Sequence, residues 1–392
     1  MQYYISTDKP FPLFCYNDFM EQKVYVFDPT VKDSQSQMRG IGRYLQTLKE
    51  NFSQEELVFT ADVKSIPRQS VLINPFLNLL QPLPFFSRLA QTQIGVIHDL
   101  IPLKYPRHFP IGLLASIKLF FRRLTLRHYD LFVTDSQASK NDLIKILRIP
   151  EKKIRVIYPA FSQRFLPHLT YPPDENSRLM FQKTADSQEH PQYSPFASEQ
   201  FVDNPQIKSL TNFVLYVGDG SWNKNLPTLA RALKIANVPV VLVGKVFENA
   251  EPHKLTHPWQ KDLQLFFKEI QGDAKFTLLG YVTDVELKYL YKTARINLLV
   301  SRDEGFGYSF VEAGMCSTPS VLADIPVLRE IGQEGALYAK PEDPLDIAKK
   351  IVELYFNPQN RELYSVRAFE RAQDFSPKAF RESWLKTIKT LV

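Results

Sequence analysis

The chain has 392 residues, with 48 Lys and Arg against 42 Asp and Glu, which gives a net charge of +6. This length favours two domains of ordinary size, and 44% hydrophobic with 23% charged residues excludes a disordered or fibrous chain. Its two cysteines, Cys15 and Cys316, are too few for a disulfide framework and indicate a reducing compartment.

The first half of the chain alternates short apolar runs with helical patterns. Strands are predicted at residues 23–28, 56–59, 71–73, 93–98, 131–134 and 154–157. Helices are predicted between them at residues 41–51, 111–128 and 136–147. Strands that are apolar on both faces and separated by helices are typical of a parallel sheet covered on both sides.

A polar stretch, residues 168–212, interrupts this pattern with five prolines and no sustained periodicity. A segment of this composition is typical of a linker or insertion, so the domain boundary is predicted there. The first domain is then residues 1–167 and the second residues 213–375, and a helix near the C-terminus, within 376–392, is expected to pack back on the first domain.

The second half repeats the strand and helix alternation. Strands are predicted at residues 213–217, 238–243, 276–279, 296–300, 320–322 and 336–338. Helices are predicted at residues 226–236, 259–271, 284–293, 308–316, 344–356 and 384–392. The fold class is therefore α/β, with two doubly wound domains that face each other across a cleft, where ligands bind at the carboxyl ends of the strands.

Positive charge gathers in the first half, where residues 81–170 contain 14 Lys and Arg but only 5 Asp and Glu. Residues 111–128 place Arg and Lys among apolar residues at helical spacing, as in helices that lie on an anionic membrane surface. A packed helix with a solvated basic face is the alternative interpretation. No apolar run is long enough to span a membrane and no secretory signal is present at the start, so a cytoplasmic or peripheral protein is expected.

The strongest motif is the segment from Ser301 to Glu312, SRDEGFGYSFVE, in which a strand leads through a glycine loop into a helix. Backbone N–H groups at such a helix start form a cradle for a diphosphate. Glu304 and Glu312 are expected at the same cleft, where two carboxylates would bind sugar hydroxyls rather than phosphates.

Three further segments point to the same cleft. Lys224 follows the Gly218–Gly220 turn just before a helix that Asn225 is predicted to cap, and is positioned to meet an anion. His98 ends an apolar strand, and glycines at 40 and 42 precede a helix, which permits close backbone approach to a ligand. The P-loop, G-x-S-x-G, H-E-x-x-H and D-x-D motifs do not occur, so a site without metal or cofactor is preferred.

Together these motifs resemble the family-4 glycosyltransferases of GT-B architecture, which are retaining nucleotide-sugar transferases of polysaccharide and glycolipid synthesis. The segments that carry the resemblance are GIGRYL, IHDLIPL, TDSQASKNDL, VIYPAF, NKNLPTLARAL, GYVTDVELKYLYKTA and SRDEGFGYSFVEA, the last with the E-x7-E pattern of Glu304 and Glu312. The likeness covers nearly the whole chain outside residues 1–22 and 168–212.

The resemblance implies a role for each matching residue. Glu304, Lys224 and His98 would be the catalytic residues, with Glu304 facing the donor sugar, Lys224 neutralising the departing diphosphate and His98 near the reaction centre. Glu312 would hold the ribose hydroxyls, and the other donor contacts would be Gly305, Phe306, Gly307, Tyr308, Ser309, Gly218 and Gly42. Asp99, Ser139 and Tyr44 would contact the acceptor.

This chain departs from the family at the positions where arginine is common, which here are Asp219 and Asn223. Neutralisation of the diphosphate would then depend on Lys224 and the helix dipoles, with Arg43 or Arg302 assisting. Tyr308 and Ser309 stand where Leu-Pro is commoner.

The resemblance implies transfer of a sugar from GDP-mannose or a UDP-sugar to a hydroxyl of a glycan or lipid-linked acceptor. The main alternative is a non-catalytic GT-B scaffold subunit that docks to a membrane or a partner enzyme, which the two missing arginines favour. A GT-B epimerase or phosphorylase is a further alternative. Nucleic-acid binding is disfavoured, because no reading module is present and the carboxylates at the cleft would repel a phosphate backbone.

Overall fold

The computed structural model describes residues 22–31, 40–165, 202–248 and 252–391. Most of the predicted 168–212 linker lies outside the described residues. Its last part, residues 202–212, contains a short helix, α6 (Pro205–Lys208), and buries Val202 and Ile207 in the core of the second domain.

The first domain is built on a parallel six-stranded sheet with the order β2-β1-β3-β4-β5-β6. Its strands are β1 (Val24–Phe27), β2 (Leu57–Thr60), β3 (Val71–Asn74), β4 (Thr92–Val96), β5 (Leu131–Thr134) and β6 (Ile154–Val156). Its helices are α1 (Gly40–Asn51), α2 (Ile101–Lys104), α3 (Leu113–Thr125) and α4 (Gln137–Leu147). The glycines at 40 and 42 lie in the first turn of α1 rather than before it.

The second domain has a parallel sheet with the order β12-β11-β10-β7-β8-β9. Its strands are β7 (Val214–Val217), β8 (Val240–Val243), β9 (Phe276–Leu279), β10 (Ile296–Leu299), β11 (Ser320–Ala323) and β12 (Leu337–Ala339). Its helices are α7 (Leu226–Ala236), α8 (Lys261–Ile270), α9 (Asp284–Thr293), α10 (Tyr308–Met315), α11 (Pro326–Gly332), α12 (Pro344–Phe356) and α13 (Pro358–Ala372). This strand order is that of a dinucleotide-binding Rossmann domain, with its switch point between β7 and β10.

Helices cover both faces of each sheet, so every sheet has an apolar core on either side. The sequence patterns predicted neither α2 nor the pair α11 and α13. Helices α2 and α11 are short. Helix α13 has a largely polar sequence, and its small residues Ala368 and Ala372 pack against α10. Without a clear apolar stripe, such a helix carries little periodic signal.

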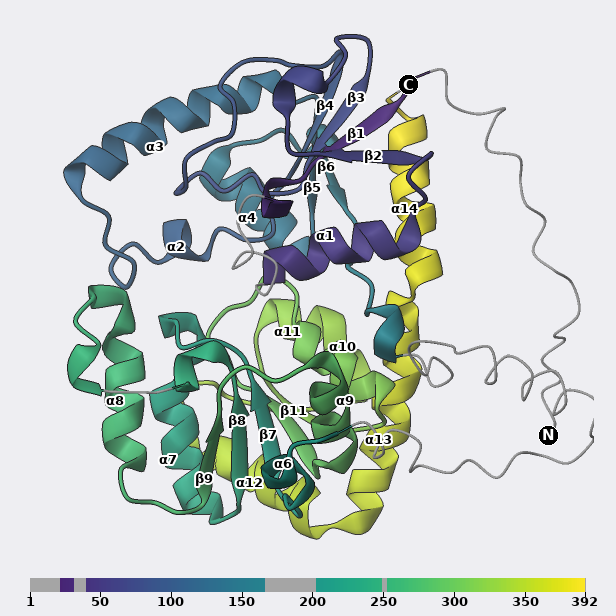
Figure 1. Cartoon of the computed structure of the whole chain (residues 1–392). Coiled ribbons are helices and arrows are strands. Elements are labelled where there is room, and N and C mark those ends of the chain that lie inside the picture. Colours follow the sequence, from purple (N-terminus) through teal and green to yellow (C-terminus); the bar gives the residue numbers. More distant parts are fainter. Residues whose placement is uncertain (1–21, 32–39, 166–201, 249–251, 392) are drawn as a thin grey trace, which may run out of the picture.

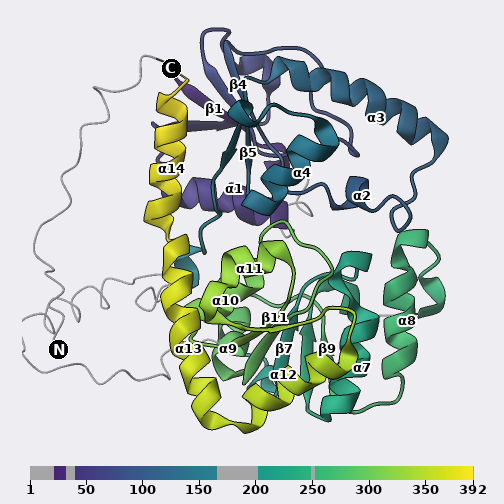
Figure 2. The same cartoon turned by 180° about the vertical axis from the view of Figure 1, so that it is seen from behind.

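The last helix, α14 (Pro377–Lys389), runs along one edge of the molecule from the second domain to the first (Figure 1). Seen from behind, α13 and α14 follow one another along this edge (Figure 2). Phe380, Trp384 and Ile388 of α14 are buried in the first-domain core against α1. The chain thus crosses between the domains twice, once before β7 and once at this edge.

Candidate active site

The two sheets point their carboxyl ends toward each other, and the loops that follow the strands meet between the domains (Figure 1). In the second domain the loop after β7 and the loop after β10 flank the switch point, where doubly wound folds bind ligands. Asn225, in the left-handed conformation at φ 59°, joins the two loops, because its Nδ2 donates to Val300 O at 3.1 Å and Pro341 O at 2.6 Å. Asn225 occupies the N-cap position of α7, as predicted, but its side chain makes no capping bond to the helix.

Lys224 and Glu304 form a largely buried ion pair at this point. The Lys224 ammonium lies 2.7 Å and 3.0 Å from the two Glu304 carboxylate oxygens, and Ser301 donates its hydroxyl to the same carboxylate at 2.6 Å. Burial, the largest single effect, would lower the pKa of Lys224, but the carboxylates of Glu304, Asp219 and Asp99 together raise that pKa. Lys224 therefore carries a full positive charge across the neutral pH range.

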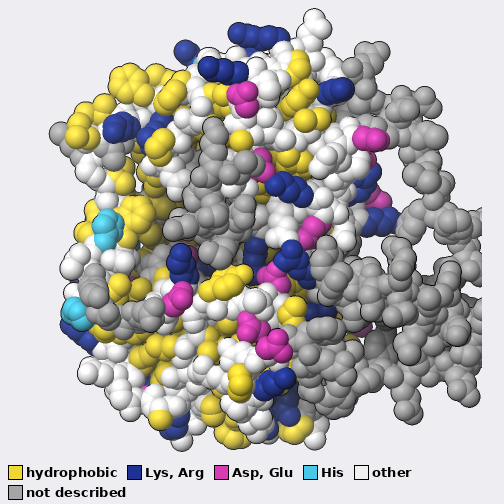
Figure 3. Space-filling model, viewed as in Figure 1, with side chains coloured by type: hydrophobic (Ala, Val, Ile, Leu, Met, Phe, Trp, Pro, Cys, Tyr) yellow, Lys and Arg dark blue, Asp and Glu magenta, His cyan; other side chains and the backbone are white. Residues whose placement is uncertain are grey.

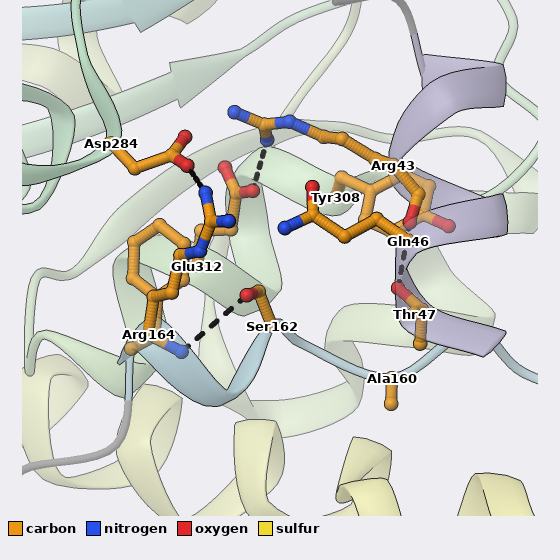
Figure 4. Close-up of a pocket in the computed structure, with 10 residues that line it drawn as sticks. Arg43, Gln46, Thr47, Ala160, Ser162, Arg164, Asp284, Tyr308 and Glu312 are labelled. Carbon is orange, nitrogen blue, oxygen red and sulfur yellow. Dashed lines mark hydrogen bonds and ion pairs between the residues drawn. The ribbon is translucent and has the colours of Figure 1, made fainter. Parts of the chain in front are cut away.

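Glu312 lies one turn into α10, which begins after Gly307 at φ 112°. Its carboxylate is buried and accepts the Tyr291 hydroxyl at 2.9 Å, and Arg43 of α1 forms an ion pair with its other oxygen (Figure 4). Burial raises the pKa of Glu312, and Arg43 and Tyr291 offset part of this effect. Glu304 and Glu312 thus each have a cation of their own, and Arg43 supplies one from across the cleft.

His98 follows β4 and has both ring nitrogens within hydrogen-bond distance of acceptors. Nδ1 lies 2.7 Å from a carboxylate oxygen of Asp135, and Nε2 lies 3.1 Å from Pro75 O. Burial, the largest single effect, would lower the pKa of His98, but Asp135 in the first place, with Asp99 and the Pro75 carbonyl, raises that pKa above its ordinary value. With an acceptor oxygen beside each ring nitrogen, the geometry suits the imidazolium form, which donates from both nitrogens.

A titration of His98 tests this pair. We expect the wild-type His98 pKa to lie above 6.5 and to fall in Asp135→Asn, because burial remains while the carboxylate is lost. Since the folded pKa is the higher one, the pair contributes stability that is complete below about pH 6.5 and is lost as the pH rises through the folded pKa. Nuclear magnetic resonance of the His98 ring protons measures this value, and an unchanged pKa in Asp135→Asn would contradict the pairing.

The glycine loop of the second domain rests directly on the first domain. A Cβ atom at Gly305 would lie 3.0 Å from His98 O and 3.3 Å from the Asp99 Cβ, and Ser139 donates its hydroxyl to Gly305 O at 3.3 Å. A side chain at position 305 would therefore push the domains apart. The backbone of the glycine loop thus packs directly against the residues that follow β4.

Several contacts across the cleft were not predicted from the sequence. Lys104 of α2 bridges Asp303 at 2.7 Å and Asp142 at 2.9 Å. Glu330 of α11 accepts the first free N–H groups of α4, from Gln137 at 2.6 Å and Ala138 at 3.0 Å. These residues come from separate motifs with no shared spacing, so nothing in the sequence indicated the Lys104 contacts. For the Glu330 contact the one indication is the start of α4, because the first N–H groups of a helix bind anions.

The other predicted site residues have either local structural roles or buried side chains. The Asp99 carboxylate caps α2 through Ile101 N at 3.0 Å, Gly42 is buried in α1, and Gly218 leaves no room for a Cβ beside Tyr216. The side chains of Phe306 and Tyr44 are core residues, and the hydroxyls of Tyr308 and Ser309 are buried. Tyr44 is 0% exposed with its ring 4.7 Å from that of His98, so it supports His98 and offers no surface to an acceptor.

Asp219 and Asn223 stand at the two positions where the resemblance leads one to expect arginine, and each makes a hydrogen bond within the second domain instead. Asp219 accepts the Ser221 N–H at 2.9 Å, and buried Asn223 donates to Asp303 O at 3.1 Å. Arg302 pairs with Asp262 and Glu342, both at 2.8 Å. The expectation that Arg302 assists at the diphosphate is therefore not supported, whereas Arg43 lies in the cleft.

Arg43 and Glu312 line a pocket between the domains, together with Gln46, Thr47, Ala160, Ser162, Arg164, Phe165, Asp284 and Tyr308 (Figure 4). The space open to the centre of a water molecule is only about 20 Å³, little more than one water needs. A ligand larger than a water molecule would therefore enter this pocket only if its walls moved apart. Among the residues that the structure describes, no cluster of three His, Cys, Asp or Glu is arranged to hold a metal ion.

Comparison with known proteins gives a consistent result. Residues 198–371 match the family described as "Glycosyl transferases group 1". The chain is 25% identical over 262 residues to the O-antigen chain mannosyltransferase RfbU of Salmonella typhimurium and 28% identical over 290 residues to the O-antigen chain mannosyltransferase B of Escherichia coli. These alignments cover 65% and 72% of this chain, but only 58% and 66% of the relatives' length.

Solved structures share the fold. HepE of Anabaena, in complex with UDP and glucose, superposes with a TM-score of 0.65 at 17% identity, over 94% of this chain and all of that one. Sucrose-phosphate synthase of Thermosynechococcus elongatus has a TM-score of 0.55 at 18% identity, over 82% of this chain and 73% of that one. The architecture is therefore the GT-B fold. Across the described residues, no helix has the length and apolar character needed to cross a membrane.

Proposed function

We propose that this chain, whose residues 198–371 belong to the glycosyl transferases group 1 family, is a hexosyltransferase of glycan biosynthesis. It would move a sugar, with mannose as the first candidate, from a nucleoside-diphosphate donor to a hydroxyl of a glycan or lipid-linked acceptor. Two relatives that are named O-antigen chain mannosyltransferases support this choice of sugar. The observation that carries the proposal is the largely buried Lys224–Glu304 pair at the switch point.

Each charged group has a role in this reaction. Breaking the bond between the sugar and the diphosphate places negative charge on the phosphate, and Lys224 would stabilise that charge. Glu304 would accept hydrogen bonds from the donor sugar, and Glu312 from the ribose. The reaction needs no metal in this proposal, because side-chain cations face the diphosphate.

The stereochemical course is proposed to be retention. Glu304 and Glu312 are each engaged with a cation and with a hydroxyl of Ser301 or Tyr291, so neither is arranged as the free nucleophile of a double displacement. The acceptor hydroxyl would then attack from the face that the diphosphate leaves. Closure of the cleft would exclude water from the donor.

A donor panel tests the function. The purified full chain is mixed with GDP-mannose, UDP-glucose or UDP-N-acetylglucosamine, with and without a membrane lipid extract, and release of nucleoside diphosphate is measured. We expect release from GDP-mannose that depends on the extract. Binding of a donor without turnover under any condition would favour the non-catalytic scaffold, and absence of binding to every nucleotide would refute the proposal.

We also propose that the protein sits on the inner face of the membrane through α3, where the acceptor would be at hand. Five large apolar side chains of α3 face solvent, namely Leu114 at 73% exposed, Ile117 at 47%, Phe120 at 61%, Phe121 at 59% and Leu124 at 46%. In the space-filling view, apolar and basic side chains lie next to each other over this helix (Figure 3).

The charge on α3 selects the kind of surface. Lys118, Arg123 and Arg127 are exposed or partly exposed on the helix and the turn after it, while Arg122 is tied to Leu79 O at 3.0 Å. Apolar residues that enter the headgroup region beside Lys and Arg favour an anionic bilayer, with about 1 kcal/mol per basic residue near the surface. An anionic lipid surface is therefore the proposed partner.

Co-sedimentation with vesicles measures this binding. We expect the chain to bind vesicles of phosphatidylglycerol and phosphatidylcholine, and to bind pure phosphatidylcholine far less. The double variant Ile117→Ser/Phe121→Ser should lose at least tenfold in affinity, since two apolar anchors no longer enter the bilayer. Phe356→Ser, which removes an equally exposed ring from α12, is the matched control. Equal binding by the double variant would refute the role of α3.

A further inference from the structure

The Glu312 carboxylate has a partner from each domain. Tyr291, fully buried on α9 of the same domain, donates to one oxygen. Arg43, on α1 of the first domain, pairs with the other. If Glu312 binds ribose hydroxyls, as the proposed function requires, the ribose must compete with one of these partners. Tyr291 is held in the core, so Arg43 is the partner that can be displaced.

The two loops at the switch point supply few cations for a diphosphate. In the segments 218–225 and 300–307 the cationic residues are Lys224 and Arg302, and Arg302 is held by Asp262, Glu342 and the carbonyl of Trp222. Lys224 is thus the one cation of these loops that faces Glu304 and the cleft. A diphosphate bound there would meet less positive charge than its own negative charge.

Arg43 is placed to supply the second cation. It lies in the first turn of α1, where the helix dipole already favours an anion. Its guanidinium shares the pocket with Tyr308, the first residue of α10, as Figure 4 shows. It uses one of its five N–H donors on Glu312, and its side chain is about one-third exposed, so it is free to turn.

We propose that Arg43 is an exchange cation, which pairs with Glu312 in this structure and moves to the donor diphosphate when ribose hydroxyls replace it on that carboxylate. The inference rests on the proposed function. A nucleoside alone breaks the Arg43–Glu312 pair and regains nothing. A nucleoside diphosphate breaks the same pair and gains an arginine–phosphate contact. Arg43 therefore makes the cleft select for the diphosphate.

Isothermal titration calorimetry separates the two effects. Wild type, Arg43→Ala and Arg43→Lys are titrated with GDP and guanosine, or with UDP and uridine if wild type prefers uridine nucleotides. We expect Arg43→Ala to bind the nucleoside diphosphate at least tenfold more weakly and to bind the nucleoside no more weakly than wild type does. Arg43→Lys should keep part of the preference for the diphosphate, because it retains the charge without the planar fork.

Arg164→Ala is the matched control, since Arg164 lines the same pocket but pairs with Asp284 and Glu50. Its diphosphate-to-nucleoside affinity ratio should equal that of wild type. A similar fall of the ratio in this control would assign the effect to the charge of the pocket as a whole and overturn the inference. An unchanged ratio in Arg43→Ala would overturn it as well, while a wild type that binds no nucleotide would refute the proposed function itself.

Discussion

Under the proposed transferase function, replacing Lys224 with alanine is expected to lower turnover of the nucleotide-sugar by about 10²–10³-fold, a loss typical of one preorganised hydrogen-bond donor at a developing negative charge. The reason is geometric, because the Lys224 ammonium is largely shielded from solvent at the switch point and held 2.7 Å from Glu304. With the ammonium gone, negative charge on the departing phosphate would depend on the helix starts and on Arg43. Steady-state rates of nucleoside diphosphate release measure the effect.

The variant must be shown to be folded, since it leaves a buried carboxylate without its cation. Breaking a buried pair on one side destabilises a protein by about 3–5 kcal/mol, so Lys224→Ala is compared with the double variant Lys224→Ala/Glu304→Gln, which removes both charges. We expect the double variant to regain stability and to stay inactive. Lys234→Ala, which removes an exposed partner of Glu269, should behave as wild type. Wild-type turnover in Lys224→Ala would contradict the site assignment.

Trp384→Ala is expected to reduce the free energy of unfolding by about 3–5 kcal/mol, the usual range for a large aromatic residue removed from a core. Trp384 is 0% exposed and belongs to α14, which joins the end of the chain to the first domain. Its cluster includes Tyr44, and the ring of Tyr44 packs against His98. The cavity would therefore loosen both the attachment of α14 and the support of His98. Urea denaturation measures the free energy.

Phe356→Ala provides the comparison, because it removes an aromatic ring that is 62% exposed at the end of α12. Such a surface change should alter the free energy of unfolding by no more than about 0.5 kcal/mol. If Trp384→Ala lost no more than this control, the packing of α14 would contribute little to the first domain. A loss confined to a separate transition would mean that the first domain unfolds independently of the second.

The strands were predicted closely because they are short, apolar on both faces and separated by helices. The predicted strand 296–300 corresponds to β10 at Ile296–Leu299, and 131–134 corresponds to β5. Helix ends were less accurate, as with the helix predicted at 111–128, which is α3 at Leu113–Thr125 followed by a 3-10 turn. Ends depend on caps and on tertiary contacts, and Gly112 gives α3 no side-chain cap.

The candidate site was predictable where one motif contained the whole arrangement. The loop SRDEGFG positions Glu304, and the turn before α7 positions Lys224, since both follow strands that are neighbours of the switch point. Their meeting at one cleft was predicted, but the direct ion pair between them was not, because no local pattern relates partners that are 80 residues apart. Tyr44 was predicted to contact the acceptor because it stands beside a glycine motif, but its ring is buried in the core.

Hydrophobic period and turn residues act locally, so the amino-acid sequence alone specified the two parallel sheets, the position of their loops and the chemical nature of the groups that these loops carry. Which charges meet depends on the folded arrangement. Arg43 reaches Glu312 over 269 positions of sequence, Glu330 closes the start of α4, and Arg302 turns away to Asp262 and Glu342. Such pairings depend on how two separately built domains face each other, and a local pattern contains no information on that orientation.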